Sequence, residues 1–225
     1  MTISKAIRIV SRCKPFLYLW DLYSYFFKRE YSHNHKVEVV RDYIKRYGID
    51  VFVETGTYLG DMIWKVKDIV REIHSIELDE ELAKAAQRRF HKFPYIYIYI
   101  GNSTTLLMDL LGNKIDPTVH CLFWLDAHYS SGITAKGDME TPVMQELQCI
   151  LKHPAEHVIL IDDAHSFVGQ NDYPTIEAVQ NLINNMRPDW VFEVRDDIIR
   201  IHRSHFKTLQ SSWSTKVGQE GFETN

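Results

Sequence analysis

The chain has 225 residues, which is enough for one domain with short extensions and a sizeable apolar core. Apolar residues make up 45% and charged residues 25% of the sequence, and the net charge of −4 lacks the strong basic excess that nucleic-acid-binding proteins usually carry. Cys13, Cys121 and Cys149 form no Cys-x-x-Cys pair, so we expect a reducing, cytoplasmic setting without structural disulfides.

The first segment, residues 1–35, is predicted to be an N-terminal helical extension. Its apolar side chains fall on one helical face: Phe16, Leu19, Trp20, Tyr23, Phe26 and Phe27. We expect this face to pack on its own domain or on a second subunit, which would give a homo-oligomer. A substrate lid and a contact with a membrane surface are the less favoured alternatives. The apolar run is far shorter than the roughly 20 residues of a membrane-spanning helix. It is not followed by the small residues of a cleavage site, so we do not expect a signal peptide.

Residues 36–205 form the predicted catalytic domain, in which helical and strand patterns alternate. Gly48 is expected to end a first helix as its C-terminal cap. The predicted strands are 51–53, 73–76, 95–100, 120–125 and 158–161. The predicted helices carry apolar stripes over 62–70, 82–90, 106–111 and 176–186, with a further helix starting at Thr141-Pro142 as N-cap and first residue. Continuous apolar runs of this kind indicate parallel strands covered by helices on both faces.

The last two predicted strands are different. Only three residues, Arg195 to Asp197, separate Trp190–Val194 from Ile198–His202, which is too short for a crossover helix. They must form a hairpin, so the final strand is antiparallel. The sequence therefore predicts an α/β fold with a mostly parallel seven-stranded sheet, an antiparallel last strand and helices on both faces. Residues 206–225 are predicted to be a polar C-terminal tail.

In open α/β sheets, ligands bind beyond the carboxyl ends of the strands. After the first strand comes Glu54-Thr55-Gly56-Thr57-Tyr58-Leu59-Gly60, which leads directly into a helix. Gly56 and Gly60 allow close approach of the backbone to a ligand, although a tight packing turn would also need glycine. The carboxylate of Glu54 would repel a pyrophosphate but suits a cationic ligand.

The next two strands end on polar residues as well. Glu77 closes the second strand, where a carboxylate can accept both hydroxyls of a ribose, whereas Asp79 is better explained as a helix-terminal charge. Gly101-Asn102-Ser103 follows the third strand and is small and polar, which suits the edge of an adenine ring. Three such signals at successive strand ends are stronger than any one of them.

These motifs resemble the cofactor site of class I S-adenosylmethionine (SAM)-dependent methyltransferases, over roughly residues 48–202. Tyr58 stands where the wider superfamily commonly has glycine, as it does in metal-dependent O-methyltransferases of the catechol and caffeoyl-CoA type. The resemblance implies a Rossmann-like class I methyltransferase fold with SAM as cofactor. It implies these cofactor-binding residues: Glu54, Thr55, Gly56, Thr57, Tyr58, Gly60, Glu77, Asn102, Ser103 and Asp126.

Carboxylates also follow the fourth and fifth strands. Asp126 comes after Phe123–Leu125, and Asp162 and Asp163 come after Val158–Ile161. Neighbouring strands would bring them together, where they repel one another unless a cation intervenes; a hard divalent ion such as magnesium fits oxygen ligands. In an alternative interpretation, one Asp is functional and the others cap helices.

The resemblance extends to this end. Metal-dependent O-methyltransferases hold magnesium with one Asp after the fourth strand and an acidic or amide pair after the fifth, and macrocin-type sugar O-methyltransferases carry an Asp-Asp pair there. This implies Asp126, Asp162 and Asp163 as metal ligands. His128 and His165 leave a softer metal such as zinc, manganese or iron open.

The general base does not carry over from the catechol-type enzymes. Their lysine lies three residues after the first metal Asp, where this chain has Tyr129 and Ser130. We therefore expect His128 to act as the base, with Lys136 second and Asp126 completing the catalytic set. The loop that contains both candidates is long enough to cover a substrate.

Together these features predict transfer of a methyl group from SAM to a hydroxyl of a small molecule or sugar, assisted by a divalent metal. A non-catalytic methyltransferase-like binding domain and a metal-dependent hydrolase on the same sheet are the alternatives. A nicotinamide oxidoreductase is disfavoured because the chain lacks a Gly-x-Gly-x-x-Gly run and ends its sheet in an antiparallel hairpin.

Overall fold

The computed structural model describes residues 33–126, 141–170 and 172–204. The chain divides into two compact units, Met1–Val39 and Val40–Asn225, and the second contains the whole sheet. The strands are β1 Val51–Thr55, β2 Glu72–Glu77, β3 Ile96–Ile100, β4 Cys121–Leu125, β5 Val158–Ile161, β6 Trp190–Arg195 and β7 Ile198–Arg203. The labelled helices are α3 Asp61–Val66, α4 Glu80–Phe90, α5 Ser103–Asp109, α6 Val143–Lys152 and α7 Ile176–Met186, with short helical turns at Leu110–Lys114 and Ala164–Ser166.

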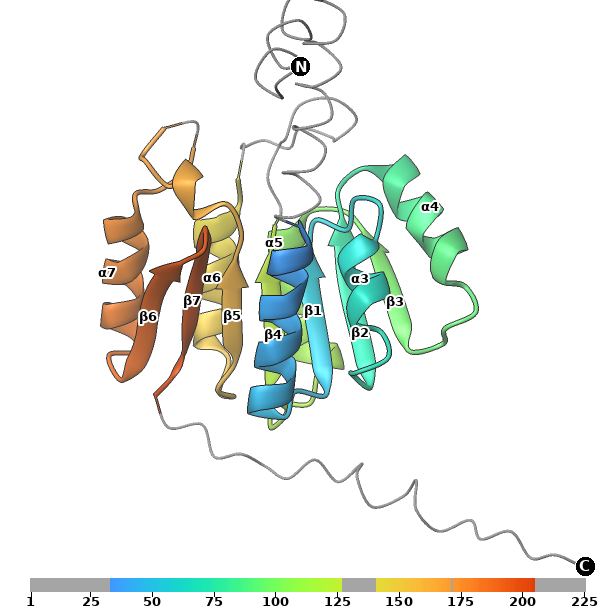
Figure 1. The fold of residues 1–225 in the computed structure, drawn as a ribbon, viewed down its shortest axis with the longest axis horizontal. Coiled ribbons are helices and arrows are strands. Elements are labelled where there is room, and N and C mark those ends of the chain that lie inside the picture. The colour runs from blue at the N-terminus through green and yellow to red at the C-terminus, as the bar shows by residue number, and fades with distance from the viewer. Residues whose placement is uncertain (1–32, 127–140, 171, 205–225) are drawn as a thin grey trace, which may run out of the picture. The chain divides into compact units, whose positions relative to one another are not determined.

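The sheet has seven strands in the order β3-β2-β1-β4-β5-β7-β6 (Figure 1). Strands β1 to β5 pair in parallel, and β7 is antiparallel to both of its neighbours. The mostly parallel sheet with an antiparallel last strand is therefore confirmed. The β6–β7 turn consists of Asp196 and Asp197 with φ of 54° and 62°, the left-handed conformation that two-residue hairpins favour.

Helices cover both faces of the sheet, with α5, α6 and α7 on one side and α3 and α4 on the other (Figure 1). One buried cluster joins these helices to the sheet. It contains Leu107 of α5, Leu147 of α6 and Ile183 of α7, together with Val53 and Phe123 of the central strands. Strands β1, β4 and β5 are buried along their whole length, as their continuous apolar runs predict. This packing fixes the strand ends where the candidate site lies.

Several helix boundaries differ from the sequence prediction. Helix α6 begins at Val143 with Pro142 in the cap position, one residue later than expected. The stripe over 106–111 is not one α-helix, because α5 widens into a π-helical turn over Leu110–Lys114. Gly48 has a φ of 59°, the left-handed cap that was predicted. Among the described helices, none is long and apolar enough to cross a membrane.

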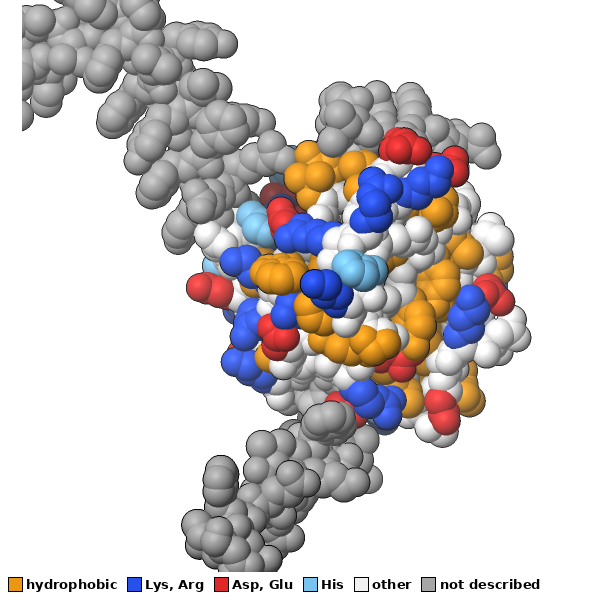
Figure 2. Space-filling view, turned by 90° about the vertical axis from the view of Figure 1, so that its right-hand side faces the viewer, with side chains coloured by type: hydrophobic (Ala, Val, Ile, Leu, Met, Phe, Trp, Pro, Cys, Tyr) orange, Lys and Arg blue, Asp and Glu red, His pale blue; other side chains and the backbone are white. Residues whose placement is uncertain are grey.

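Figure 2 looks onto the side where α4 and β3 lie. Basic side chains there are interspersed with acidic and apolar ones. Several are paired: Nζ of Lys84 lies 2.8 Å from Oε1 of Glu80, and an Arg89 nitrogen lies 2.8 Å from Oδ1 of Asp61. Pairing of this kind is typical of a solvated helix face.

Candidate functional site

Glu77 is the last residue of β2, and its carboxylate is held by two backbone N–H groups. The N–H of Tyr58 donates to Oε2 at 2.8 Å, and the N–H of Asp79 donates to Oε1 at 2.9 Å. The side chain is nearly buried. Each carboxylate oxygen retains a further lone pair, so Glu77 can still accept two hydroxyls. The loop after β1 and the loop after β2 thus fix the orientation of the predicted ribose-binding group.

Glu54 lies in β1, opposite Ser75 of β2 in the sheet register. Its carboxylate is buried and accepts a hydrogen bond from Oγ of Ser75 at 2.7 Å, and Oγ of Ser75 lies 2.6 Å from Oγ1 of Thr57. Burial raises the pKa of Glu54 well above its ordinary value, and the charges of Asp126 and Glu77 add to this, against the Ser75 hydrogen bond. A cationic ligand group beside Glu54 would restore its charged form.

Ser75 was not identified from the sequence, although a serine inside the apolar 73–76 strand was the available signal. It links two predicted cofactor residues, Glu54 and Thr57, into one buried network. The network fixes the Glu54 carboxylate before any ligand binds.

The predicted glycines divide into two kinds. Gly56 has a φ of 90° and directly follows β1, where it permits close approach to a ligand. Gly60 has a φ of 77°, and a Cβ there would lie 2.6 Å from Cε2 of Phe90. Gly60 is therefore required by the packing of α4 against the turn. Tyr58 between them has a left-handed φ of 47° and a partly exposed ring.

Asn102 and Ser103 begin α5. Oδ1 of Asn102 accepts from the N–H of Thr105 at 3.2 Å, so Asn102 is the helix cap. Ser103 is buried beside the end of the sheet. Both residues lie at the carboxyl end of β3 as predicted. Capping α5 explains the presence of Asn102 at this position even without a ligand.

At the β4–β5 end, Asp126 and Asp162 line one small cavity. Their backbones extend the sheet, because the N–H of Asp126 donates to the Thr55 carbonyl at 2.9 Å and the N–H of Asp162 donates to the Leu125 carbonyl at 3.0 Å. The cavity has a volume of about 10 Å³, close to the space that one water molecule needs. Its lining residues are Leu125, Asp126, Thr141, Val143, Glu146, Ile161, Asp162, Phe167 and Tyr173.

The third carboxylate in this cavity is Glu146 of α6, which was not predicted. It is 1% exposed, and among the described residues its Oε1 has no hydrogen-bond partner. Burial raises the pKa of Glu146 to about 7, while the nearby hydroxyls of Ser103 and Thr55 favour the charged form. The Thr55 hydroxyl nevertheless makes no hydrogen bond within the described residues. The sequence signal was an acidic residue in the apolar stripe of α6, one position before Leu147.

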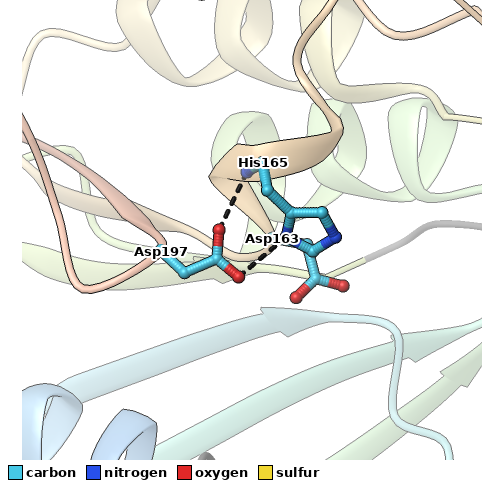
Figure 3. A group of neighbouring side chains, drawn as sticks. All are labelled: Asp163, His165 and Asp197. Carbon is cyan, nitrogen blue, oxygen red and sulfur yellow. Dashed lines mark hydrogen bonds and ion pairs between the residues drawn. The ribbon is translucent and has the colours of Figure 1, made fainter.

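Asp163 is not among the residues that line the cavity. It has a left-handed φ of 51° and lies beside His165 and Asp197 (Figure 3). Ligand atoms of these three residues lie within 4.8 Å of one another, the one such group among the described residues. Asp197 accepts from the His165 N–H at 2.8 Å, and its other oxygen lies 2.8 Å from the ring Nδ1.

The structure thus brings Asp126 and Asp162 to one cavity and Asp163 to a more exposed group with His165. Convergence of all three aspartates on one metal stays a prediction. The two predicted bases, His128 and Lys136, lie outside the described residues, as do the segment over 16–27 that was predicted to be helical and the predicted tail over 206–225.

No protein-family model matches the sequence, and no curated protein matches it closely enough in sequence to serve as a relative. Solved structures do resemble the fold. The O-methyltransferase TomG from Streptomyces achromogenes, involved in tomaymycin synthesis and solved with SAM, is 13% identical over 75% of this chain and 78% of that chain, with a TM-score of 0.55.

Two further solved structures resemble the fold to a similar degree. An O-methyltransferase from Bacillus cereus, solved with S-adenosylhomocysteine (SAH), is 12% identical over 75% of this chain and 80% of that chain, with a TM-score of 0.56. A putative O-methyltransferase from Klebsiella pneumoniae is 14% identical over 75% and 79%, with a TM-score of 0.53. At such identities the likeness establishes the fold alone, and this chain has the Rossmann-like fold of class I methyltransferases.

Proposed function

We propose that the protein is a SAM-dependent O-methyltransferase that acts on a hydroxyl of a small molecule or sugar. The observation that carries the proposal is the Glu77 carboxylate, fixed by two backbone N–H groups at the end of β2 beside the Gly56 turn. In an open α/β sheet, this is where a ribose-binding carboxylate is expected. The shared fold with three O-methyltransferase structures supports the same reaction class.

The cofactor fits the charges at this end of the sheet. SAM carries an ammonium and a sulfonium, and the buried Glu54 gains most from a nearby positive group because desolvation otherwise disfavours its charge. We assign Glu77 to the ribose, Glu54 to the cationic amino-acid end, and Gly56 to close backbone approach. Asn102 and Ser103 are assigned to the adenine edge. We assign Asp126, whose charge acts on Glu54, to the acceptor side of the cofactor.

We also propose a divalent cation at the β4–β5 end, with Asp126 and Asp162 as two of its ligands; the family resemblance implies Asp163 as a third. Asp126 and Asp162 line one cavity together with the apolar side chains of Leu125, Val143, Ile161 and Phe167, a setting that suits charge compensation by an ion. Such an ion would lower the pKa of an acceptor hydroxyl and hold its oxygen in place.

In the reaction, the acceptor oxygen forms a bond to the methyl carbon, the bond from that carbon to sulfur breaks with its electron pair going to sulfur, and the hydroxyl proton leaves to a base. Positioning of the two reactants supplies much of the rate. His128 is the proposed base and Lys136 the second candidate, both on sequence grounds. A sugar acceptor rests on the macrocin-type resemblance.

The test measures cofactor binding and methyl transfer separately. SAH should raise the melting temperature of the folded protein, because a ligand that binds only the native state stabilises it. Transfer of tritium-labelled methyl from SAM to a panel of sugars, polyols and phenols should follow, and should weaken in a chelator. A folded protein that shows no shift with millimolar SAH would overturn the proposal. SAH binding without transfer to any acceptor would favour a binding domain.

A further inference from the structure

The cavity at the β4–β5 end is too small for an organic acceptor. Its volume of about 10 Å³ matches one water-sized occupant. Three of its lining side chains are carboxylates, Asp126, Asp162 and Glu146, and Thr141 adds a hydroxyl. A single small occupant beside three carboxylates is expected to be a cation or a water molecule.

Glu146 distinguishes between these two occupants. It comes from α6, whereas Asp126 and Asp162 follow β4 and β5, and it is 1% exposed. Within the part of the chain that the structure describes, its Oε1 has no hydrogen-bond partner. A buried carboxylate oxygen without a partner destabilises the folded protein, because it has lost its hydration without gaining a hydrogen bond. One water could satisfy that oxygen, but it would bring no positive charge to the three carboxylates that line the cavity.

We propose that Glu146 completes, with Asp126 and Asp162, a site for one hard divalent cation such as Mg²⁺ or Mn²⁺. This rests on the proposed function in that Asp126 and Asp162 are cation ligands there. The three carboxylates do not form a group whose ligand atoms all lie within 4.8 Å. Binding therefore has to draw them together around the ion, as expected for carboxylates that repel one another without one.

The inference changes the expected third ligand. Asp163 follows Asp162 in sequence, but it lies with His165 and Asp197 in a more exposed group. Glu146 lies in the same cavity as Asp126 and Asp162, although it is separated from them in sequence. Removing the Glu146 carboxylate should therefore weaken cation binding more than removing that of Asp163.

The experiment measures Mn²⁺ binding to the full chain by the electron paramagnetic resonance signal of free Mn²⁺, without SAM or acceptor. Glu146→Gln keeps the shape of the side chain and should weaken Mn²⁺ binding by about 10–100-fold. Asp163→Asn should weaken it less. Glu177→Gln removes the same charge from an exposed position on α7 and should leave binding unchanged. Melting curves check that each variant is folded.

Mn²⁺ binding by Glu146→Gln equal to that of the parent, with loss in Asp163→Asn, would overturn the inference. Absence of Mn²⁺ binding by the parent would overturn it too, while SAH binding would still decide the proposed function separately. If Glu146→Gln does not fold, Glu146→Asp retains the charge on a shorter side chain. Its Mn²⁺ affinity should fall between those of the parent and Asp162→Asn, and an unchanged affinity would contradict the inference.

Discussion

The two ends of the candidate site hold their carboxylates in different ways. At the β1–β3 end, Glu77 accepts hydrogen bonds from two backbone N–H groups, and Glu54 accepts one from the Ser75 hydroxyl. At the β4–β5 end, Glu146 has a buried oxygen without a partner among the described residues. The first end is arranged before a ligand binds, whereas the second is completed by one. We expect a ligand at the second end to stabilise the protein more per contact made.

The energies agree with this difference. A hydrogen bond to a charged group contributes about 1.5–3 kcal/mol, so Glu77 is held firmly in its ligand-free position. An unsatisfied buried acceptor costs about 1–3 kcal/mol or more, which a cation at Glu146 would remove. The cofactor end is therefore preorganised for its ligand, whereas at the cation end ligand binding should also stabilise the folded protein.

The largest effect is expected for Gly60→Ala. This variant tests whether Gly60 is needed for ligand binding or for packing against Phe90. The new Cβ would lie 2.6 Å from Cε2 of Phe90 at a left-handed φ. The free energy of unfolding should fall by about 3 kcal/mol, from overpacking and backbone strain together. Gly112→Ala is the matched control, because a Cβ there meets nothing within 4 Å. Urea unfolding curves measure both; a Gly60→Ala protein as stable as the parent would contradict the packing role.

Next in size is the loss of cofactor affinity in Glu77→Ala. Removing the carboxylate deletes its predicted charged hydrogen bonds to the ribose, which together contribute about 1.5–3 kcal/mol, so SAH should bind about 10–100-fold more weakly. Calorimetric titration measures the affinity. Glu81→Ala removes a carboxylate that is 82% exposed on α4 and should leave SAH affinity unaltered. Equal SAH affinity in the two folded variants would remove Glu77 from the site.

The smallest expected effect concerns the pH dependence of Glu54. Because burial raises its pKa, the unfolded chain gives up the proton at lower pH than the folded protein does. This group therefore lowers stability as pH rises from the unfolded pKa through the folded one. Glu54→Gln removes that loss, so its stability gain over the parent should be larger near about pH 8 than near about pH 5, on the order of 1 kcal/mol. A gain independent of pH would mean that Glu54 folds in its charged form.

Much of the fold was predictable because it depends on local patterns. Continuous apolar runs predicted buried parallel strands, and the three residues between the last two runs predicted the antiparallel hairpin. The π-helical turn after α5 was not predicted, since the apolar stripe continues through it. Gly112 and Asn113, which lie in that turn, are poor helix formers and were the available warning.

The site residues were predictable only where the ends of the strands determine their positions. Glu54, Glu77, Asp126 and Asp162 lie at the carboxyl edge because the register of the sheet brings them there. Asp163 does not line the cavity, because its left-handed backbone turns the chain after Asp162. Glu146 comes from a helix whose rotation on the sheet is set by tertiary packing, so only its place in an apolar stripe indicated a special role.

A crystal structure of the full chain with SAH and Mn²⁺ tests the central claim most directly, because anomalous scattering locates the manganese. We predict the ribose hydroxyls at Glu77, the SAH ammonium near Glu54, and manganese between Asp126, Asp162 and Glu146. SAH bound away from Glu77 would contradict the cofactor assignment. Manganese bound instead at Asp163, His165 and Asp197 would contradict the division of the site into these two ends.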